Sequence, residues 1–377
     1  MIIGVLKEIK TGEYRVAISP ENVQRLVRKG HTVLVQSGAG AGSGMEDRDY
    51  AAAGASVVED SGVLYREAEM LLKVKELTPP EYEQLKIGQI LFAYIHSAIR
   101  PELTQTLLDK RIIGFACEDI RQENGQFPLL APMSEIAGEV GMIMGIYHSM
   151  TTNGGAGLLI GGAPGVEPAK IVILGAGHAG LGAARYAHAL GADVTIVDVN
   201  IDRLRDIRSH ILPSVKTLYS NDSNIRRLLP ETDVLVNAVK WVPGLTLVSR
   251  SMLSLMKKNS LIIDVDCEPG GAIETCAFTT HDDPIFEVDG IRHFCVPNLP
   301  SAVARTASYA FTNATIPYIE QIADKGWERA ARENSALRSG LDFALGHLLF
   351  ETTASFQNRP YMTADRLFER LDAERAT

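Results

Sequence analysis

The sequence has few cysteines, and they are far apart. Cys117, Cys267, Cys276 and Cys295 form neither a CxxC pair nor a Cys/His pattern with metal-ligand spacing. Such spacing is what marks zinc sites and disulfide frameworks in a sequence. We therefore predict free, mostly buried thiols in a reducing compartment, and no metal site.

Long apolar runs and clusters of positive charge are also missing. A membrane span needs about 18 consecutive apolar residues, and no segment comes close. Lys7 and Glu8 interrupt the first apolar residues before a signal peptide could form. The formal net charge of −9 and the lack of a basic run argue against nucleic acid or a membrane as partner. We expect a cytoplasmic globular protein.

The chain is long enough for two domains. Its 377 residues exceed one ordinary hydrophobic core, so two domains of roughly 150 to 200 residues are expected. Short apolar runs alternate with helical stretches in the first part, as in parallel βαβ units, and Ser19 followed by Pro20 marks a helix start.

A second α/β pattern follows a predicted connecting helix at 135–152. Its expected strands are 169–175, 193–199, 233–239 and 260–266. Residues 302–326 and 333–356 read as helices, which we expect to return to the first domain. The predicted class is α/β with two doubly wound Rossmann-like domains. The first comprises 1–129 with about 307–377, and the second comprises 130–306.

The most specific motif is a glycine-rich turn between a predicted strand and helix. Gly175 permits the tight turn, Gly177 lets the backbone approach a pyrophosphate, and Gly180 lets the helix pack on the strand. Asp198 ends the next strand, where a carboxylate binds ribose hydroxyls and repels a 2′-phosphate. The motif predicts NAD. A structural turn without ligand, or NADP held by Arg203 or Arg205, is the alternative.

Together with this turn, several longer motifs resemble the alanine dehydrogenase family over essentially the whole chain. They lie at 7–20, 73–76, 94–96, 130–138 and 161–168. The resemblance implies reversible NAD-dependent oxidative deamination of L-alanine to pyruvate and ammonia, by a homohexamer. A related soluble transhydrogenase subunit shares the architecture.

The resemblance also assigns site residues. It implies a catalytic acid/base at His96 and substrate binding by Arg15, Lys75 and Asn298. Tyr94, two residues before His96 and on the same strand face, belongs either to the pocket or to the core. The implied dinucleotide contacts are Ser134, Asp198, Arg203, Ser220 and Val239.

These residue types suit the implied chemistry. An arginine fork binds a carboxylate bidentately, and the Lys75 ammonium polarises an oxygen as a point charge. The imidazole of His96 titrates near neutrality, so it can deprotonate the water that attacks an imine. Surface charges and a structural histidine are the alternative interpretations. Because the implied substrate and cofactor residues fall in different predicted domains, we expect an interdomain active-site cleft.

Two segments depart from the family pattern. Glu268 stands where the family has an active-site aspartate, and Asp266 is a second acid nearby, so either carboxylate is a candidate catalytic group. Lys240 and Trp241 occupy a normally apolar segment. Neutral drift explains both changes, or they indicate an opine-type or other amino-acid dehydrogenase that takes a larger amine. A non-catalytic NAD-binding subunit is the remaining alternative.

Overall fold

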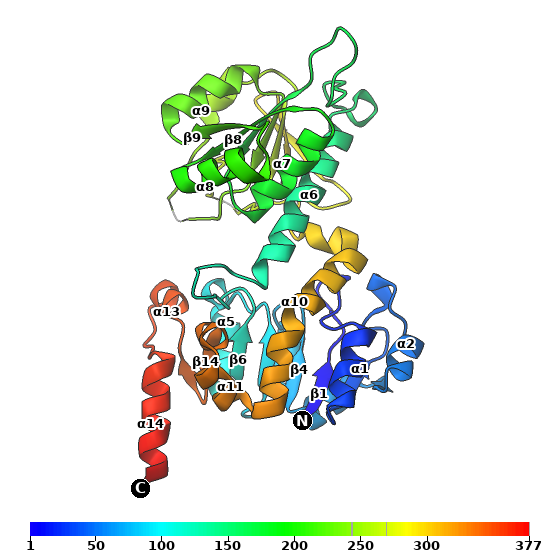
Figure 1. Cartoon of the computed structure of the whole chain (residues 1–377), viewed down its shortest axis with the longest axis vertical. Coiled ribbons are helices and arrows are strands. Elements are labelled where there is room, and N and C mark those ends of the chain that lie inside the picture. The colour runs from blue at the N-terminus through cyan, green and yellow to red at the C-terminus, as the bar shows by residue number, and fades with distance from the viewer. Residues whose placement is uncertain (243, 269, 377) are drawn as a thin grey trace. The chain divides into compact units, whose positions relative to one another are not determined.

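The computed structural model describes residues 1–242, 244–268 and 270–376. The chain forms two compact units (Figure 1). Unit 1 contains Met1–Met133 and Val303–Thr377, and unit 2 contains Ser134–Ala302. The C-terminal segment therefore returns to the first unit.

Unit 1 is built on an eight-stranded sheet in the order β15-β14-β6-β5-β4-β1-β2-β3. Strands β1 to β6 pair in parallel, and β14 and β15 pair antiparallel at one edge. The strands are β1 (Ile2–Val5), β2 (Thr32–Gln36), β3 (Ser56–Val58), β4 (Met70–Leu72), β5 (Ile90–Ala93), β6 (Ile113–Ala116), β14 (Leu341–Ala344) and β15 (His347–Leu348).

Helices surround this sheet, and the last of them, α14, extends away from it (Figure 1). They are α1 (Pro20–Arg28), α2 (Asp47–Ala52), α3 (Ser61–Glu67), α4 (Pro79–Tyr82), α5 (Pro101–Asp109), α10 (Ala304–Lys325), α11 (Trp327–Glu333), α12 (Ser335–Ser339), α13 (Glu351–Gln357) and α14 (Ala364–Ala376). Helix α1 begins as predicted, because the Ser19 side chain caps it by accepting from the Asn22 amide at 3.4 Å.

The prediction of helix throughout 333–356 was wrong. Residues 341–348 form β14 and β15, and β14 pairs antiparallel with β6. Without β14 the backbone of β6 would have no partner on that side, and an unpaired buried strand edge is costly. Tertiary pairing therefore overrides the local helical pattern.

Unit 2 contains a seven-stranded sheet in the order β12-β13-β11-β10-β7-β8-β9. All its pairs are parallel except β12 with β13. The strands are β7 (Lys170–Leu174), β8 (Asp193–Asp198), β9 (Lys216–Tyr219), β10 (Val234–Asn237), β11 (Leu261–Asp264), β12 (Ile285–Val288) and β13 (Ile291–Phe294), and the helices are α6 (Leu130–His148), α7 (His178–Ala189), α8 (Ile201–Asp206) and α9 (Asp222–Leu228). The four strands predicted in this region are confirmed as β7, β8, β10 and β11, and the two sheets confirm the α/β class.

The central strands of both sheets are short and apolar because both of their faces are covered. All four residues of β5, β6, β10 and β11 are buried. Continuous apolar runs of this kind are typical of parallel sheets between helix layers. The first polar side chains consequently occur where the strands end.

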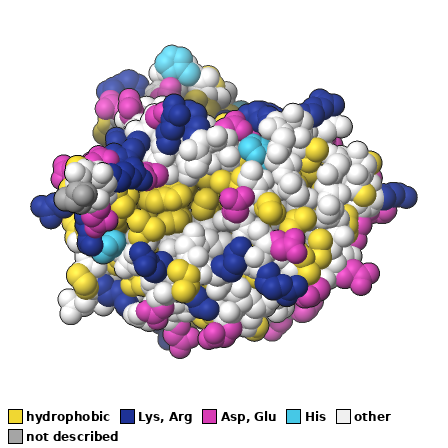
Figure 2. Space-filling model, turned by 90° about the horizontal axis from the view of Figure 1, so that it is seen from below, with side chains coloured by type: hydrophobic (Ala, Val, Ile, Leu, Met, Phe, Trp, Pro, Cys, Tyr) yellow, Lys and Arg dark blue, Asp and Glu magenta, His cyan; other side chains and the backbone are white. Residues whose placement is uncertain are grey.

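The surface is of mixed charge on the face in Figure 2, where basic and acidic side chains surround an apolar patch. Within 1–242, 244–268 and 270–376, no helix combines the length and apolar character that crossing a bilayer requires.

A close helix contact in unit 2 can be tested by adding one methyl group. A Cβ built on Gly138 of α6 would lie 1.8 Å from the Ala179 carbonyl oxygen of α7. We expect Gly138→Ala to lower the free energy of unfolding by about 1–3 kcal/mol, because backbone atoms must move apart. Urea denaturation measures this. Gly177→Ala is the control, since its Cβ would meet nothing within 4 Å. Equal stability of the two variants would contradict the contact.

Candidate active site

Polar residues of unit 1 gather at one edge of its sheet. Strands β6, β5, β4 and β1 are parallel neighbours, so their carboxyl ends lie side by side. Glu118 follows β6, His96 follows β5, Lys75 follows β4, and Glu8 follows β1. Such an edge is where open α/β sheets bind ligands.

His96 is held by its backbone. Its φ of 47° lies in the left-handed region, which is uncommon for residues other than glycine. The amides of Ile95 and His96 both donate to the Glu118 carboxylate. The imidazole Nδ1 lies 3.5 Å from Glu118 Oε1. The carboxylate thus fixes the direction in which this imidazole projects.

Burial lowers the pKa of His96, while the Glu118 carboxylate opposes that shift. Burial in turn raises the pKa of Glu118, and His96 opposes it. The imidazole is therefore neutral at pH 7. With Nδ1 toward Glu118, Nε2 is left as the basic nitrogen.

Tyr94 is a buried neighbour of His96. Their rings stack with centroids 5.9 Å apart, and the Tyr94 hydroxyl donates to the Leu129 carbonyl at 2.7 Å. Tyr94 is only 3% exposed. Tyr94 is therefore a core residue that packs against the imidazole of His96.

Arg15 is buried and already paired with an acid of its own loop. Its Nε and Nη2 donate to the two carboxylate oxygens of Glu13 at 2.7 and 2.6 Å, and Nη1 contacts the Met133 sulfur at 3.2 Å. Burial lowers the pKa of Arg15, but the Glu13 contacts outweigh this and raise it. The guanidinium is thus a fixed cation whose fork is oriented by Glu13.

Lys75 lies near both Arg15 and His96. Burial lowers the pKa of Lys75 to about 8, and the Arg15 charge contributes to this. The Lys75 backbone is anchored because its amide donates to Glu8 Oε1 at 3.2 Å. Each of these side chains alters the pKa of the next, so Arg15, Lys75 and His96 form one electrostatic cluster.

The glycine turn of unit 2 has the geometry that the motif predicts. Gly175 has a φ of 99°, and a Cβ there would lie 2.7 Å from the Ala238 carbonyl oxygen. A Cβ on Gly180 would lie 1.9 Å from the Gly175 carbonyl oxygen, whereas one on Gly177 would meet nothing. Gly177 is exposed and begins α7, so its backbone can approach an anion.

The peptide at Ala176 is held from both sides. Asp198 Oδ2 accepts from the Ala176 amide at 2.7 Å, and Arg203 Nε donates to the Ala176 carbonyl at 3.0 Å. Asp198 Oδ1 accepts from the Asn200 amide at 2.8 Å. Carboxylate oxygens carry two lone pairs each, so Asp198 retains capacity for ribose hydroxyls. The turn and its two flanking side chains fit a dinucleotide.

Three further residues are predicted to contact the dinucleotide, and each has its own contacts in unit 2. The Ser220 amide donates to the Asp198 carbonyl at 2.9 Å. The Val239 amide would lie 3.1 Å from a Cβ on Gly175. Ser134 is half-buried on α6, beside Glu135, whose carboxylate contacts His178 Nδ1 at 3.1 Å.

The departing segments contact each other in unit 2. Asp266 follows β11, is exposed, and accepts from the Trp241 amide. Glu268 is half-buried, and its carbonyl accepts from the Gly271 amide at 2.9 Å. Asn298 follows β13 with a φ of 60°, and its carbonyl accepts from the Ser301 amide at 3.0 Å.

Sequence reasoning missed two acids of unit 1. Glu13 orients Arg15, and Glu118 orients His96. Glu118 could have been found, because it is the first acid after an apolar strand, as His96 is the first titratable group after the end of β5 apart from Tyr94. No sequence pattern indicated the role of Glu13, because two nearby residues of a loop form an ion pair only in particular loop conformations.

Family models match nearly all of the chain. The alanine dehydrogenase/PNT N-terminal domain matches residues 4–137, and the alanine dehydrogenase/PNT C-terminal domain matches residues 141–351. The chain belongs to the alanine dehydrogenase/PNT family. The family implies a nicotinamide dinucleotide as cofactor, which the glycine turn fits.

Curated relatives named alanine dehydrogenase match at full length. The protein of Methanococcus maripaludis is 45% identical over 97% of this chain and 99% of its own length, and that of Bacillus subtilis is 44% identical over 98% of each. A solved L-alanine dehydrogenase superposes with a TM-score of 0.90 at 40% identity, covering 95% of this chain and 99% of its own. A transhydrogenase structure from Sinorhizobium meliloti, at 24% identity, 93% and 99% coverage and a TM-score of 0.77, shares the fold.

The contact between Glu118 and His96 predicts a shift in titration. Glu118→Gln removes the charge that raises the pKa of His96, so we expect that pKa to fall further. An NMR pH titration of the imidazole measures it. Glu123→Gln, an exposed position in the same segment, should leave the pKa unchanged. A His96 pKa that is the same in the Glu118 variant and the parent would refute the coupling.

Proposed function

We propose that this chain is an NAD-dependent alanine dehydrogenase, which converts L-alanine to pyruvate and ammonia reversibly. The observation that carries the proposal is the cluster of Arg15, Lys75 and His96 at one sheet edge of a chain whose other unit has a dinucleotide turn. The names of its full-length relatives support the same activity.

The two cations of the cluster bind the substrate. The carboxylate of alanine or pyruvate pairs with the Arg15 guanidinium, which Glu13 holds in a fixed plane. The Lys75 ammonium points a charge at the oxygen of pyruvate, or at the carboxylate. Both groups are buried or half-buried, which strengthens their attraction for an anion.

His96 moves the proton. A bound nicotinamide dinucleotide would supply the hydride acceptor. Alanine bound as the free amine would lose the Cα hydride and become an iminium ion. Water adds to the iminium carbon while Nε2 of His96 takes its proton. The same nitrogen gives this proton to the amino nitrogen, which leaves as ammonia, and then takes the hydroxyl proton as the carbonyl of pyruvate forms.

The cofactor form that we propose is NAD. The Asp198 carboxylate beside the turn suits ribose hydroxyls and repels a 2′-phosphate. Arg203 is engaged with the Ala176 carbonyl and with Asp206 at 3.3 Å, and Arg205 pairs with Asp202. Neither arginine is therefore arranged for a phosphate.

Asp266 and Glu268 are both proposed to serve the reaction from unit 2. Asp266 holds the Trp241 amide, and Trp241 also packs 3.4 Å from the Cβ position of Gly271. The two segments that depart from the family pattern therefore contact each other. This favours a joint functional change in both segments over independent neutral drift in each. Asp266→Asn and Glu268→Gln, compared for kcat, identify which carboxylate acts on water or ammonia. Ser134, Ser220, Val239 and Asn298 are proposed as further ligand contacts.

We also propose a cytoplasmic homohexamer. Figure 2 shows an exposed apolar patch on one face, and patches of this kind commonly mark subunit contacts.

The activity is tested with NADH and pyruvate. We expect rapid NADH oxidation with ammonia and little with a panel of amino acids as amine donors. His96→Ala should lower kcat by about 10²–10⁴-fold, because the proton acceptor is lost. His210→Ala, at an exposed position on the other unit, is the control. Turnover that requires a bulky amine would replace the proposal with an opine-type reaction, and NADH binding without any turnover would support a non-catalytic subunit.

The Lys75 pKa of about 8 predicts how pyruvate binding depends on pH. Pyruvate keeps its charge across this range, whereas Lys75 loses its proton as the pH rises. We expect the Kd of pyruvate for the NADH complex to be flat from pH 7 to 8 and then to rise by up to about tenfold per pH unit. Fluorescence quenching of bound NADH reports it. Lys75→Arg keeps its charge, so its Kd should stay flat above pH 8. If the Kd of this variant still rises above pH 8, a group other than Lys75 causes the pH dependence.

A further inference from the structure

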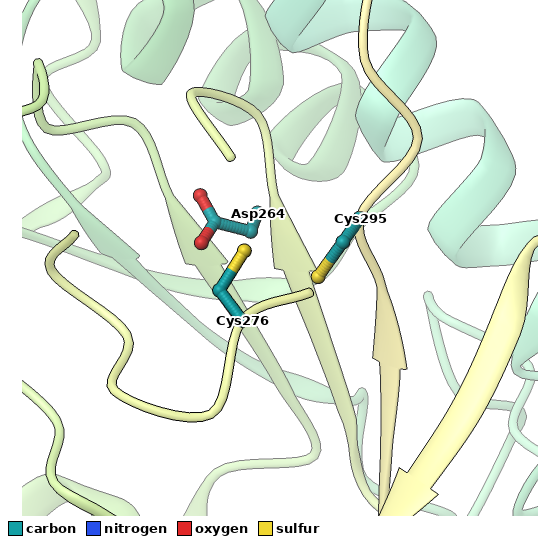
Figure 3. A group of neighbouring side chains, drawn as sticks. All are labelled: Asp264, Cys276 and Cys295. Carbon is teal, nitrogen blue, oxygen red and sulfur yellow. The ribbon is translucent and has the colours of Figure 1, made fainter. Parts of the chain in front are cut away.

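Three of the four cysteines come together in unit 2, although the sequence separates them. Figure 3 shows Cys276 and Cys295 beside Asp264. Cys267 neighbours Cys276. Asp264 ends β11, and Cys295 directly follows β13, which pairs in parallel with β11. The loop after β11 folds back to bring Cys276 against both.

The donor atoms are close enough to share one ion. One carboxylate oxygen of Asp264 and the sulfurs of Cys276 and Cys295 all lie within 4.8 Å of one another. In a tetrahedral site with Zn–S bonds of about 2.3 Å, sulfurs are separated by about 3.8 Å. Small side-chain rotations therefore complete such a site.

Cys267 offers a fourth donor atom. Its Sγ donates to the Cys295 carbonyl at 3.2 Å, and its side chain neighbours that of Cys276. Cys267 is not among the donors that lie within 4.8 Å of one another, so its side chain must rotate away from the carbonyl to reach the ion. Two thiolates or three, with one carboxylate, are ligands that zinc accepts.

The backbone around the cluster is fixed by its own hydrogen bonds. The Cys276 amide donates to the Ile273 carbonyl at 3.1 Å, and the Thr279 amide donates to the Cys295 carbonyl at 3.1 Å. Asn237 Nδ2 donates to Asp264 Oδ1 at 2.7 Å. Outer contacts of this kind orient metal ligands.

All four side chains are buried, with Asp264 and Cys295 at 1% and 0% exposure. Thiols are tolerated in a dry core, whereas a buried carboxylate needs hydrogen bonds, a proton or a cation. A divalent cation would replace the protons of these groups and meet that need.

We propose that Asp264, Cys276 and Cys295, with Cys267 as fourth ligand, bind one zinc-class divalent ion. Because every donor is buried, the ion is structural and not a site for substrate. It ties residues 265–268 and 270–276, the first of which carry Asp266 and Glu268, to the sheet. The sequence prediction of no metal site relied on short ligand spacing, whereas here eight residues separate Cys267 from Cys276 and eighteen separate Cys276 from Cys295.

The test uses the full chain, purified under reducing conditions from zinc-supplied cells. We expect about one zinc per chain by elemental analysis. After chelation, Co²⁺ should give sulfur-to-cobalt charge-transfer bands and the visible bands of tetrahedral cobalt. Cys276→Ser and Asp264→Asn should each lower retained zinc at least tenfold, while Cys117→Ser, a buried thiol of unit 1, should retain it.

If a variant fails to fold, measurements on the parent protein alone still decide the proposal. Reduced, folded parent that retains no zinc and gives no cobalt–thiolate bands would overturn the proposal. So would a disulfide among Cys267, Cys276 and Cys295, shown by thiol counting on a second preparation that is purified and unfolded without reductant. Activity is not the readout, so failure of the proposed dehydrogenase function would leave this result unaffected.

Discussion

Parallel pairing of buried strands determines where chemistry can occur in both units. A parallel strand covered on both faces leaves no room for polar side chains along its length, and its neighbours all end at the same edge. In unit 1 this edge collects Glu118, His96 and Lys75, and in unit 2 it collects Gly175, Asp198 and Asp264. The candidate residues are remote in sequence but adjacent in space for this one reason.

The charges at the edge of unit 1 are buried or half-buried and are balanced by acids. Glu13 neutralises Arg15, and Glu118 faces His96. Glu8, close to the Lys73 ammonium at 3.5 Å, has a pKa raised to about 7 by burial. A buried cation that is paired on one side can still bind an anion on another, because its own acid fixes the geometry and removes part of the desolvation cost. The arrangement favours small anions that fit between the acid–base pairs already present at this edge.

Much of this could be read from the sequence. The glycine turn has a strict local signature, and the class of fold follows from the alternation of apolar runs and helices. Chain segments that pair only through tertiary structure could not be read in the same way. Residues 341–348 look helical alone, yet they form β14, which pairs with β6, and β15, which pairs with β14. Glu13 acts through a loop that folds back on Arg15, and the cysteines gather only because β11 and β13 are neighbours.

The two side-chain hydrogen bonds to the Ala176 peptide affect the rate at which a dinucleotide associates. With Asp198 on the amide and Arg203 on the carbonyl, the turn is already in one conformation before any phosphate arrives. Few backbone rearrangements remain to be made on encounter, so little conformational entropy is lost in binding there. Association can then be limited by diffusion and orientation, and the lifetime of the complex is left to the contacts made by the rest of the dinucleotide.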